Sequence, residues 1–177
     1  MKCYLDLGAH HGEAFAHFIP ALGIDDTWHI DLYEPNPTAM IVLIQNCMGV
    51  KVPARLHALA VGKQGISSFW MQRDGREDFT LDGYGSALDN VKSTEKGLGG
   101  FAVNVGVVNL ATAFSMIPPC DEYHIKIDIE GAEYDLDWDS VPQGAHCYVE
   151  WHDWNNTVIN KSIIQQTRPD ITWHDWT

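Results

Sequence analysis

The chain has 177 residues, 45% of them hydrophobic and 20% charged, a composition typical of one soluble globular domain with its own core. Its 24 acidic and 11 basic residues give a net charge of -13, which argues against a surface that tracks nucleic-acid phosphates. The four cysteines form no CxxC pair, and no apolar run is long enough to cross a bilayer. We therefore expect a single domain over residues 1–177, cytoplasmic, that binds neither nucleic acid nor membrane.

The N-terminal third predicts a strand–turn–helix–strand unit. A short apolar strand at residues 4–7 leads into the turn DLGAHHG at residues 6–12, and residues 13–22 have the pattern of a helix. A second strand, 29–33, ends at Glu34. Glycines in such a turn let the backbone approach a ligand, and an acid after the second strand accepts hydrogen bonds from ribose hydroxyls. The unit therefore predicts a site for an adenosine-type cofactor.

The next segments predict a helix and two strands. Residues 38–47 have a helical pattern, with Thr38 as the expected N-cap behind Pro37. Residues 55–61 predict a third strand and 66–71 a fourth, and the short glycine-containing link between them predicts a hairpin.

The amino-acid composition changes at the start of the second half of the chain. Residues 72–102 are rich in glycine and charge and poor in periodic apolar residues, so we predict a loop or lid over the substrate. The elements expected after it are strands at 102–110, 123–130, 147–152 and 171–176, and helices at 111–117 and 157–166. Strands separated by helix-length segments predict the α/β class, with a Rossmann-like doubly wound, mostly parallel sheet.

Two of the later strands carry ionisable side chains on one face. Lys126, Asp128 and Glu130 alternate along the first, and Glu150 and His152 along the second. Buried parallel strands are usually apolar, so these groups either pair internally or face a site. The ligand crevice of an open α/β sheet lies at the carboxyl ends of its strands. The side chains expected at that edge are Asp6, Glu34, Asp128, Glu130 and His152.

Both interpretations stay open for Lys126, which could pair with Asp128 or Glu150 as an internal brace. For Asp128 and His152, which lie nearest the strand ends, we favour a functional role. His152 is our candidate general base, because an imidazole titrates near neutral pH.

A tetrapeptide, WHDW, occurs at residues 151–154 and again at 173–176. Histidine and aspartate are metal ligands, but this spacing matches no known ligand frame, and the flanking residues differ. We treat the repeat as a coincidence and assign no metal-ligating residue.

Taken together, these segments resemble the FkbM-type S-adenosylmethionine-dependent methyltransferases of the class I Rossmann-like group. Four stretches carry the match: DLGAHHG at 6–12, YEPNP at 33–37, AVG at 60–62 with Gly65, and IKIDIEGAE at 125–133. The last closely resembles the family's Lys-Ile-Asp-x-Glu-Gly-Ala-Glu signature. In sequence span the resemblance covers nearly the whole chain.

The resemblance implies S-adenosyl-L-methionine as the cofactor. Asp6, Gly8 and Gly12 would shape its methionine and ribose end, and Glu34 would bind the ribose hydroxyls. Asn36 would lie near the adenosine. The full set expected at the cofactor is Asp6, Gly8, Ala9, His10, Gly12, Glu34, Asn36, Ala60, Val61 and Asp128.

The resemblance also implies an O-methyltransferase acting on a small-molecule or glycan hydroxyl, such as that of a sugar or polyketide. Asp128 and Glu130 would border the methyl-transfer site. His152 is the first candidate for the base, and Asp128 or Glu130 is the second. An acidic pocket would favour a neutral polyol over an anionic acceptor.

Two departures from the family pattern leave alternatives open. Leu110-Ala111 stands where the family commonly has Leu-Asp, and both ends of the chain look trimmed. We expect either a compact version of the fold or one completed by a partner subunit, as in a homo-oligomer. A non-catalytic binding subunit is one alternative. An NAD-dependent oxidoreductase is the other, although the third glycine of GxGxxG is missing and Glu34 lies 26 residues after Gly8 rather than about 20.

Overall fold

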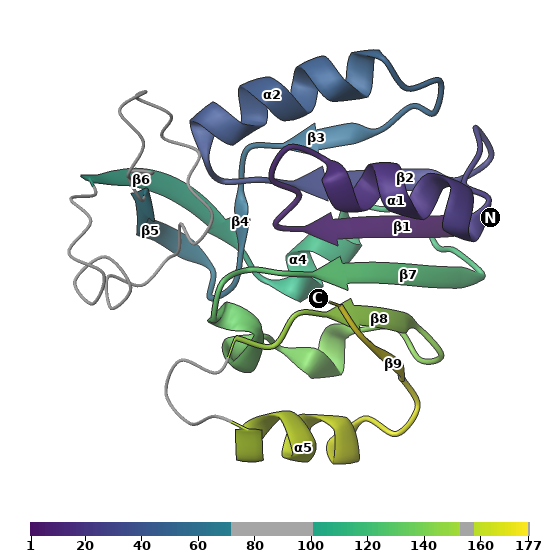
Figure 1. The fold of residues 1–177 in the computed structure, drawn as a ribbon. Helices are drawn as coiled ribbons and strands as arrows, with labels where there is room; N and C mark the ends of the chain where they lie inside the picture. The colour runs from purple at the N-terminus through teal and green to yellow at the C-terminus, as the bar shows by residue number, and fades with distance from the viewer. Residues whose placement is uncertain (72–100, 153–157, 177) are drawn as a thin grey trace.

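The computed structural model describes residues 1–71, 101–152 and 158–176 (Figure 1). A six-stranded parallel sheet forms its centre, in the order β3-β2-β1-β7-β8-β9. The strands are β1 (Lys2–Leu7), β2 (His29–Tyr33), β3 (Arg55–His57), β7 (Glu122–Ile127), β8 (His146–Val149) and β9 (Thr172–Asp175). The strand order reverses between β1 and β7, and ligands of open α/β sheets bind at such a switch point. The expected α/β class and doubly wound parallel sheet are confirmed.

Helices cover both faces of this sheet. They are α1 (Glu13–Leu22), α2 (Pro37–Met48), α4 (Leu110–Ser115) and α5 (Val158–Thr167), with 3₁₀ turns at Ala132–Asp135 and Trp138–Ser140. In the part of the chain that the structure describes, no helix has the length and apolar character needed to cross a bilayer.

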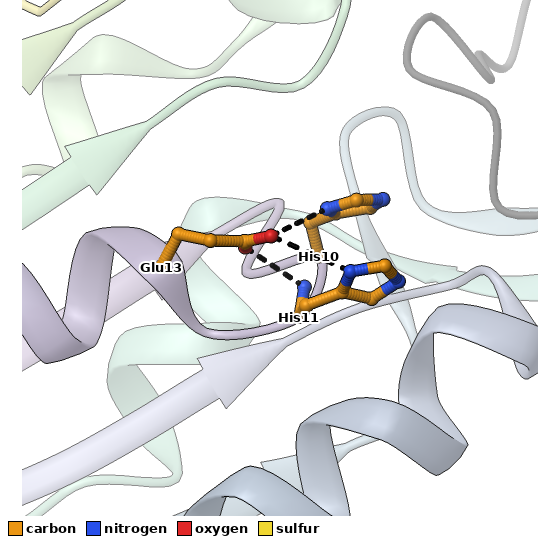
Figure 2. Close-up of side chains that lie close together, drawn as sticks. All are labelled: His10, His11 and Glu13. Atoms are coloured by element: carbon orange, nitrogen blue, oxygen red, sulfur yellow. Dashed lines mark hydrogen bonds and ion pairs between the residues drawn. The ribbon is translucent and has the colours of Figure 1, made fainter.

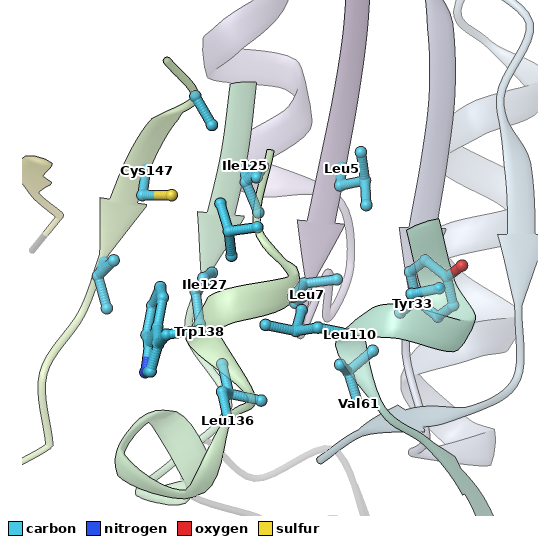
Figure 3. Close-up of a cluster of buried hydrophobic side chains, with 14 of the residues drawn as sticks. Leu5, Leu7, Tyr33, Val61, Leu110, Ile125, Ile127, Leu136, Trp138 and Cys147 are labelled. Atoms are coloured by element: carbon cyan, nitrogen blue, oxygen red, sulfur yellow. The ribbon is translucent and has the colours of Figure 1, made fainter. Parts of the chain in front are cut away.

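Alternation along the strands explains the two layers. Tyr4 and Leu32 belong to the core under α1 and α2, with Phe15 and Leu43. Their neighbours on the same strands point the other way. These form a second core with α4 and the 3₁₀ turns, in which Leu5, Leu7, Tyr33, Ile125, Ile127, Leu110 and Trp138 take part (Figure 3). Burying each such side chain contributes about 1.5–3 kcal/mol, so the two cores fix the positions of the strand ends.

The start of α2 differs from expectation. Asn36, not Thr38, is the N-cap: its side-chain oxygen accepts hydrogen bonds from the backbone N–H groups of Thr38 at 2.9 Å and Ala39 at 3.3 Å. Pro37 occupies the first helical turn, where its missing N–H leaves no carbonyl unpaired.

The expected third strand, 55–61, is wrong as one element, because it divides between two sheets. Arg55–His57 is β3 of the central sheet, whereas Ala60–Val61 is β4 of a three-stranded sheet in the order β4-β6-β5. The other strands of that sheet are β5 (Gly65–Met71) and β6 (Phe101–Val108). The expected hairpin is also wrong. β6 lies between β4 and β5, parallel to the first and antiparallel to the second.

Several other boundaries shift by a few residues. The strand expected to reach residue 110 ends at Val108, and Asn109 caps α4 through the N–H of Thr112 at 2.8 Å. β7 ends at Ile127 and β8 at Val149, so the acidic and histidine residues after them lie in turns. Of the predicted lid, residues 72–100 lie outside the described residues, and its last two residues belong to β6.

Candidate active site

A cavity of about 260 Å³ opens at the carboxyl edge of the central sheet, between that sheet and the smaller one. It is lined by Gly8, Ala9, His10, Glu13, Ala14, Glu34, Pro35, Asn36, Leu59, Ala60, Val61, Phe69, Lys126, Asp128, Ile129, Glu130 and Trp176. Eight of the ten residues expected at the cofactor are in this lining, and Asp6 and Gly12 lie outside it. The structure therefore brings together residues from segments that are far apart in the chain.

The turn after β1 depends on two glycines. Gly8 has φ +84°, and a Cβ there would lie 1.9 Å from the carbonyl oxygen of Asp128. Gly12 has φ +90° at the N-terminus of α1, against Leu43. Both conformations are costly for residues with a side chain. The backbone of this turn thus packs directly against the turn after β7, which closes one end of the cavity.

Glu34 is buried in the cavity wall, with 5% of its surface exposed. Its two carboxylate oxygens each accept a hydrogen bond of 2.7 Å, one from the backbone N–H of His10 and one from that of Asn36. Burial raises the pKa of Glu34, and these two N–H groups act against that shift. The carboxylate is therefore held in one orientation, and each oxygen keeps a second lone pair for another donor.

Lys126 forms an internal brace beneath the cavity. Its buried ammonium group donates a 2.7 Å hydrogen bond to the carbonyl oxygen of Gly8 and lies 3.3 Å from carboxylate oxygens of both Asp6 and Asp128. Burial alone would lower the pKa of Lys126, but the two carboxylates outweigh it and the net shift is upward. Asp6, fully buried and bonded to the Tyr4 hydroxyl at 3.1 Å, thus supports the glycine turn from behind.

Two residues of the cavity lining, Asp128 and Glu130, lie beside His152, which is outside the lining together with Glu150. Nε2 of His152 lies 3.8 Å from Asp128 Oδ1, and 3.5 Å from an oxygen of Glu130 and of Glu150. Burial raises the pKa of Glu150, and the neighbouring charge of Asp128 raises it further. The structure therefore places the three predicted catalytic residues, His152, Asp128 and Glu130, side by side.

Glu133 organises this group, and sequence reasoning gave it no separate role. It is fully buried, and its carboxylate accepts hydrogen bonds from the N–H groups of Ile129 at 3.0 Å and Gly131 at 2.9 Å. His152 Nδ1 lies 3.0 Å from the same carboxylate. An ionised carboxylate can only accept, so Nδ1 carries a proton that it donates to Glu133, and Nε2 faces the carboxylates of Asp128, Glu130 and Glu150. The available signal was its place as the last residue of the IKIDIEGAE stretch at 125–133.

A second polar group lies in the glycine turn. The rings of His10 and His11 stack with their centroids 3.8 Å apart, and the Nδ1 atom of each lies 3.4 Å from the Glu13 carboxylate (Figure 2). The N–H of His11 also donates to Glu13 at 3.1 Å. These contacts hold the turn against the first helical turn of α1, so the side chains of this segment have structural partners as well as its backbone.

The apolar wall of the cavity was only partly foreseen. Ala60 and Val61 were expected there, whereas Leu59, Phe69 and Trp176 were not. Phe69 comes from β5 and Trp176 follows β9, so only the tertiary fold brings them to the same place. The result is a cavity with an apolar wall beside a polar end, as small-molecule sites usually have.

The fold and this site define an α/β protein with a pocket at the switch point of its sheet. The model of the FkbM methyltransferase domain matches residues 6–136, and the chain belongs to this family of methyltransferases. The match includes both the glycine turn and the segment from β7 through Glu133, as the sequence motifs predicted. No curated protein and no solved structure matches the chain.

Proposed function

We propose that this chain is an S-adenosyl-L-methionine-dependent O-methyltransferase that acts on a hydroxyl of a small molecule or glycan. The observation that carries the proposal is the shape of one cavity. Its lining joins an apolar wall and a fixed buried carboxylate, Glu34, to Asp128 and Glu130, whose carboxylates lie 3.8 and 3.5 Å from Nε2 of His152, a residue outside the lining. The first part suits a nucleoside and the second suits chemistry on a hydroxyl.

The residues present fit this cofactor. The wall formed by Leu59, Ala60, Val61 and Phe69 offers an apolar surface for a flat purine ring. Glu34 would accept hydrogen bonds from the ribose hydroxyls with the lone pairs that its backbone donors leave. At Gly8 there is no room even for a methyl side chain, so this part of the cavity wall is formed by backbone atoms alone.

The cofactor, when bound, supplies a methyl group already activated on a sulfonium sulfur. The transfer breaks the S–CH₃ bond, forms an O–CH₃ bond on the acceptor and releases the hydroxyl proton. The protein must align the two reactants and remove that proton. His152 suits the second task, because Glu133 orients its ring through Nδ1 and its Nε2 lies beside Asp128 and Glu130 of the cavity lining.

The charges near the transfer site favour a neutral acceptor. Asp128, Glu130 and Glu150 lie within 3.8 Å of one imidazole nitrogen and would repel an anionic substrate. The same carboxylates would attract the positive sulfonium. A sugar or polyketide hydroxyl is therefore the acceptor class we propose.

The sheet order supplies a second candidate, because β3-β2-β1-β7-β8-β9 is also the order of dinucleotide-binding sheets. A transfer experiment separates the two. Purified protein is incubated with methyl-labelled S-adenosylmethionine and a panel of sugar and polyketide alcohols, and label on oxygen is sought by mass spectrometry. Label transfer that is lost in His152→Ala supports the proposal. Hydride transfer to or from NAD(H) on the same alcohols, without methyl transfer, would refute it.

A further inference from the structure

The group at the end of β7 and β8 has the composition of a metal site. Asp128, Glu130 and Glu150 each turn a carboxylate oxygen toward Nε2 of His152. The ligand atoms of Asp128, Glu130 and His152 all lie within 4.8 Å of one another. The residues come from the turns after two adjacent strands, so no linear spacing in the sequence announces them.

The distances suit ligands of one ion better than hydrogen bonds. Nε2 lies 3.5–3.8 Å from the three oxygens, which is long for a hydrogen bond. Nitrogen and oxygen ligands bind Zn²⁺ at about 2.0–2.2 Å, so two ligands of one such ion lie between about 3 and 4.4 Å apart. The distances from Nε2 to the three oxygens fall inside this range.

The imidazole is oriented as metal-bound histidines commonly are. The other ring nitrogen, Nδ1, lies 3.0 Å from the fully buried carboxylate of Glu133, which is outside the ligand group. Such a carboxylate fixes the tautomer, aims the opposite nitrogen at the ion and raises its basicity. Lys126 lies against Asp128 Oδ2, whereas Oδ1 faces His152. Asp128 can therefore keep its brace and still offer one oxygen.

We propose that Asp128, Glu130 and His152, with Glu150 beside them, bind a divalent cation such as Mn²⁺ at the methyl-transfer site. Mixed carboxylate and imidazole donors suit this class of ion. The inference rests on the proposed O-methyl transfer and deepens it. A bound cation lowers the pKa of a hydroxyl that coordinates it, so the acceptor proton passes to solvent before the O–CH₃ bond forms.

The ion changes the part that His152 plays. Its Nε2 lone pair binds the cation and no longer accepts the proton, while Glu133 continues to hold the ring. Open positions on the ion would accept two neighbouring oxygens of the acceptor. The substrate class is therefore an alcohol with an adjacent hydroxyl or carbonyl oxygen that chelates the cation.

A titration of the metal-free protein with Mn²⁺ tests the site without turnover. Binding is measured as the decrease of the electron paramagnetic resonance signal of the free ion. We expect one saturable ion per chain, an affinity at least tenfold weaker in Glu130→Gln, and imidazole-nitrogen coupling in the spin-echo spectrum that disappears in His152→Gln. The matched control is Glu13→Gln, which alters a second group of possible ligands among the described residues, that of His10, His11 and Glu13, and should leave Mn²⁺ affinity unchanged. Circular dichroism verifies that each variant is folded.

Two results would overturn the site: no saturable Mn²⁺ binding to folded protein, or a loss of affinity in Glu13→Gln but not in Glu130→Gln. A parallel titration with S-adenosylhomocysteine separates this failure from that of the proposed function. Binding of S-adenosylhomocysteine without binding of Mn²⁺ would refute the cation site and leave the proposed methyltransferase function standing. Absence of cofactor-product binding counts against the methyltransferase whatever the ion does.

Discussion

Replacing Gly8 by alanine should damage the fold at the point where the glycine turn meets the turn after β7. The residue has φ +84°, and the added Cβ would lie 1.9 Å from the Asp128 carbonyl oxygen. That oxygen would have to move by roughly 1 Å or more to reach a normal van der Waals separation. Its residue is also tied to β1 through the 3.0 Å hydrogen bond from the Asp128 N–H to the Leu7 carbonyl, so the movement is resisted.

The expected decrease in the free energy of unfolding has two parts. A left-handed conformation costs a residue with a side chain about 1–2 kcal/mol. The forced separation of the two turns resembles overpacking of a core, which costs about 1–3 kcal/mol. We therefore expect Gly8→Ala to lower the free energy of unfolding by roughly 2–5 kcal/mol, a large share of the 5–15 kcal/mol of a typical domain.

Urea unfolding followed by circular dichroism measures this effect, with Gly23→Ala as the matched control. Gly23 has φ +64° at the end of α1, and no atom lies within 4 Å of its added Cβ. The control carries the backbone cost without the clash and should lose only about 1–2 kcal/mol. Equal losses in the two variants would refute the close approach of the turns.

Three further variants test the pocket, the sheet and the chemistry. Glu34→Ala should weaken S-adenosylhomocysteine binding at least tenfold in calorimetry, because the ribose hydroxyls lose the carboxylate that we propose as their acceptor. Unchanged affinity in a folded variant would count heavily against the assigned pocket. Asp31→Asn should lower the free energy of unfolding by roughly 2–3 kcal/mol at pH 7, because Asp31 accepts charged hydrogen bonds from Arg55 at 2.6 and 2.8 Å. Burial alone would raise the pKa of Asp31, but its hydrogen bonds outweigh this and the pKa falls below the ordinary 3.8. The stabilisation is therefore present above pH 3.8 and is lost as the pH falls through the lower folded value, so urea curves of Asp31→Asn and wild type should converge in acid. His152→Ala should lower turnover by about 10²- to 10⁴-fold and leave S-adenosylhomocysteine affinity within a fewfold; full activity would remove His152 from the mechanism.

The first βαβ unit could be predicted because its signals are local. The apolar strand, the glycines and the helix beginning at Glu13 follow one another directly, and α1 and β2 have the predicted bounds. The N-cap of α2 was also available from sequence. Pro37 favours the first helical position, which places the cap at Asn36 rather than at Thr38.

The division of residues 55–61 between two sheets could not be read from their pattern. Alternating apolar residues indicate an extended segment but not its partner strand. Here His57 pairs with Tyr33 in the central sheet, whereas Ala60 pairs with Val107 in the small one. The partner of Ala60 lies almost fifty residues further along the chain, so only the tertiary structure shows it.

The candidate site was predictable where it follows from topology. Carboxyl ends of parallel strands meet at one edge, and this brings Asp128, Glu130 and His152 together. The expected brace from Lys126 to Asp128 is confirmed. Its further contacts with Asp6 and the Gly8 carbonyl were not predicted, and neither was the contact between Glu133 and Nδ1 of His152. Such contacts depend on side-chain directions that a linear pattern does not contain.

Calorimetric titration of the purified protein with S-adenosylhomocysteine, with NAD(H) as the control ligand, tests the central claim most directly. The cavity beside Glu34 predicts saturable binding of one S-adenosylhomocysteine per chain and no binding of NAD(H). Binding of NAD(H) alone would contradict the proposed cofactor and move the site to the dinucleotide class. Binding of neither ligand would contradict a cofactor pocket formed by this chain alone.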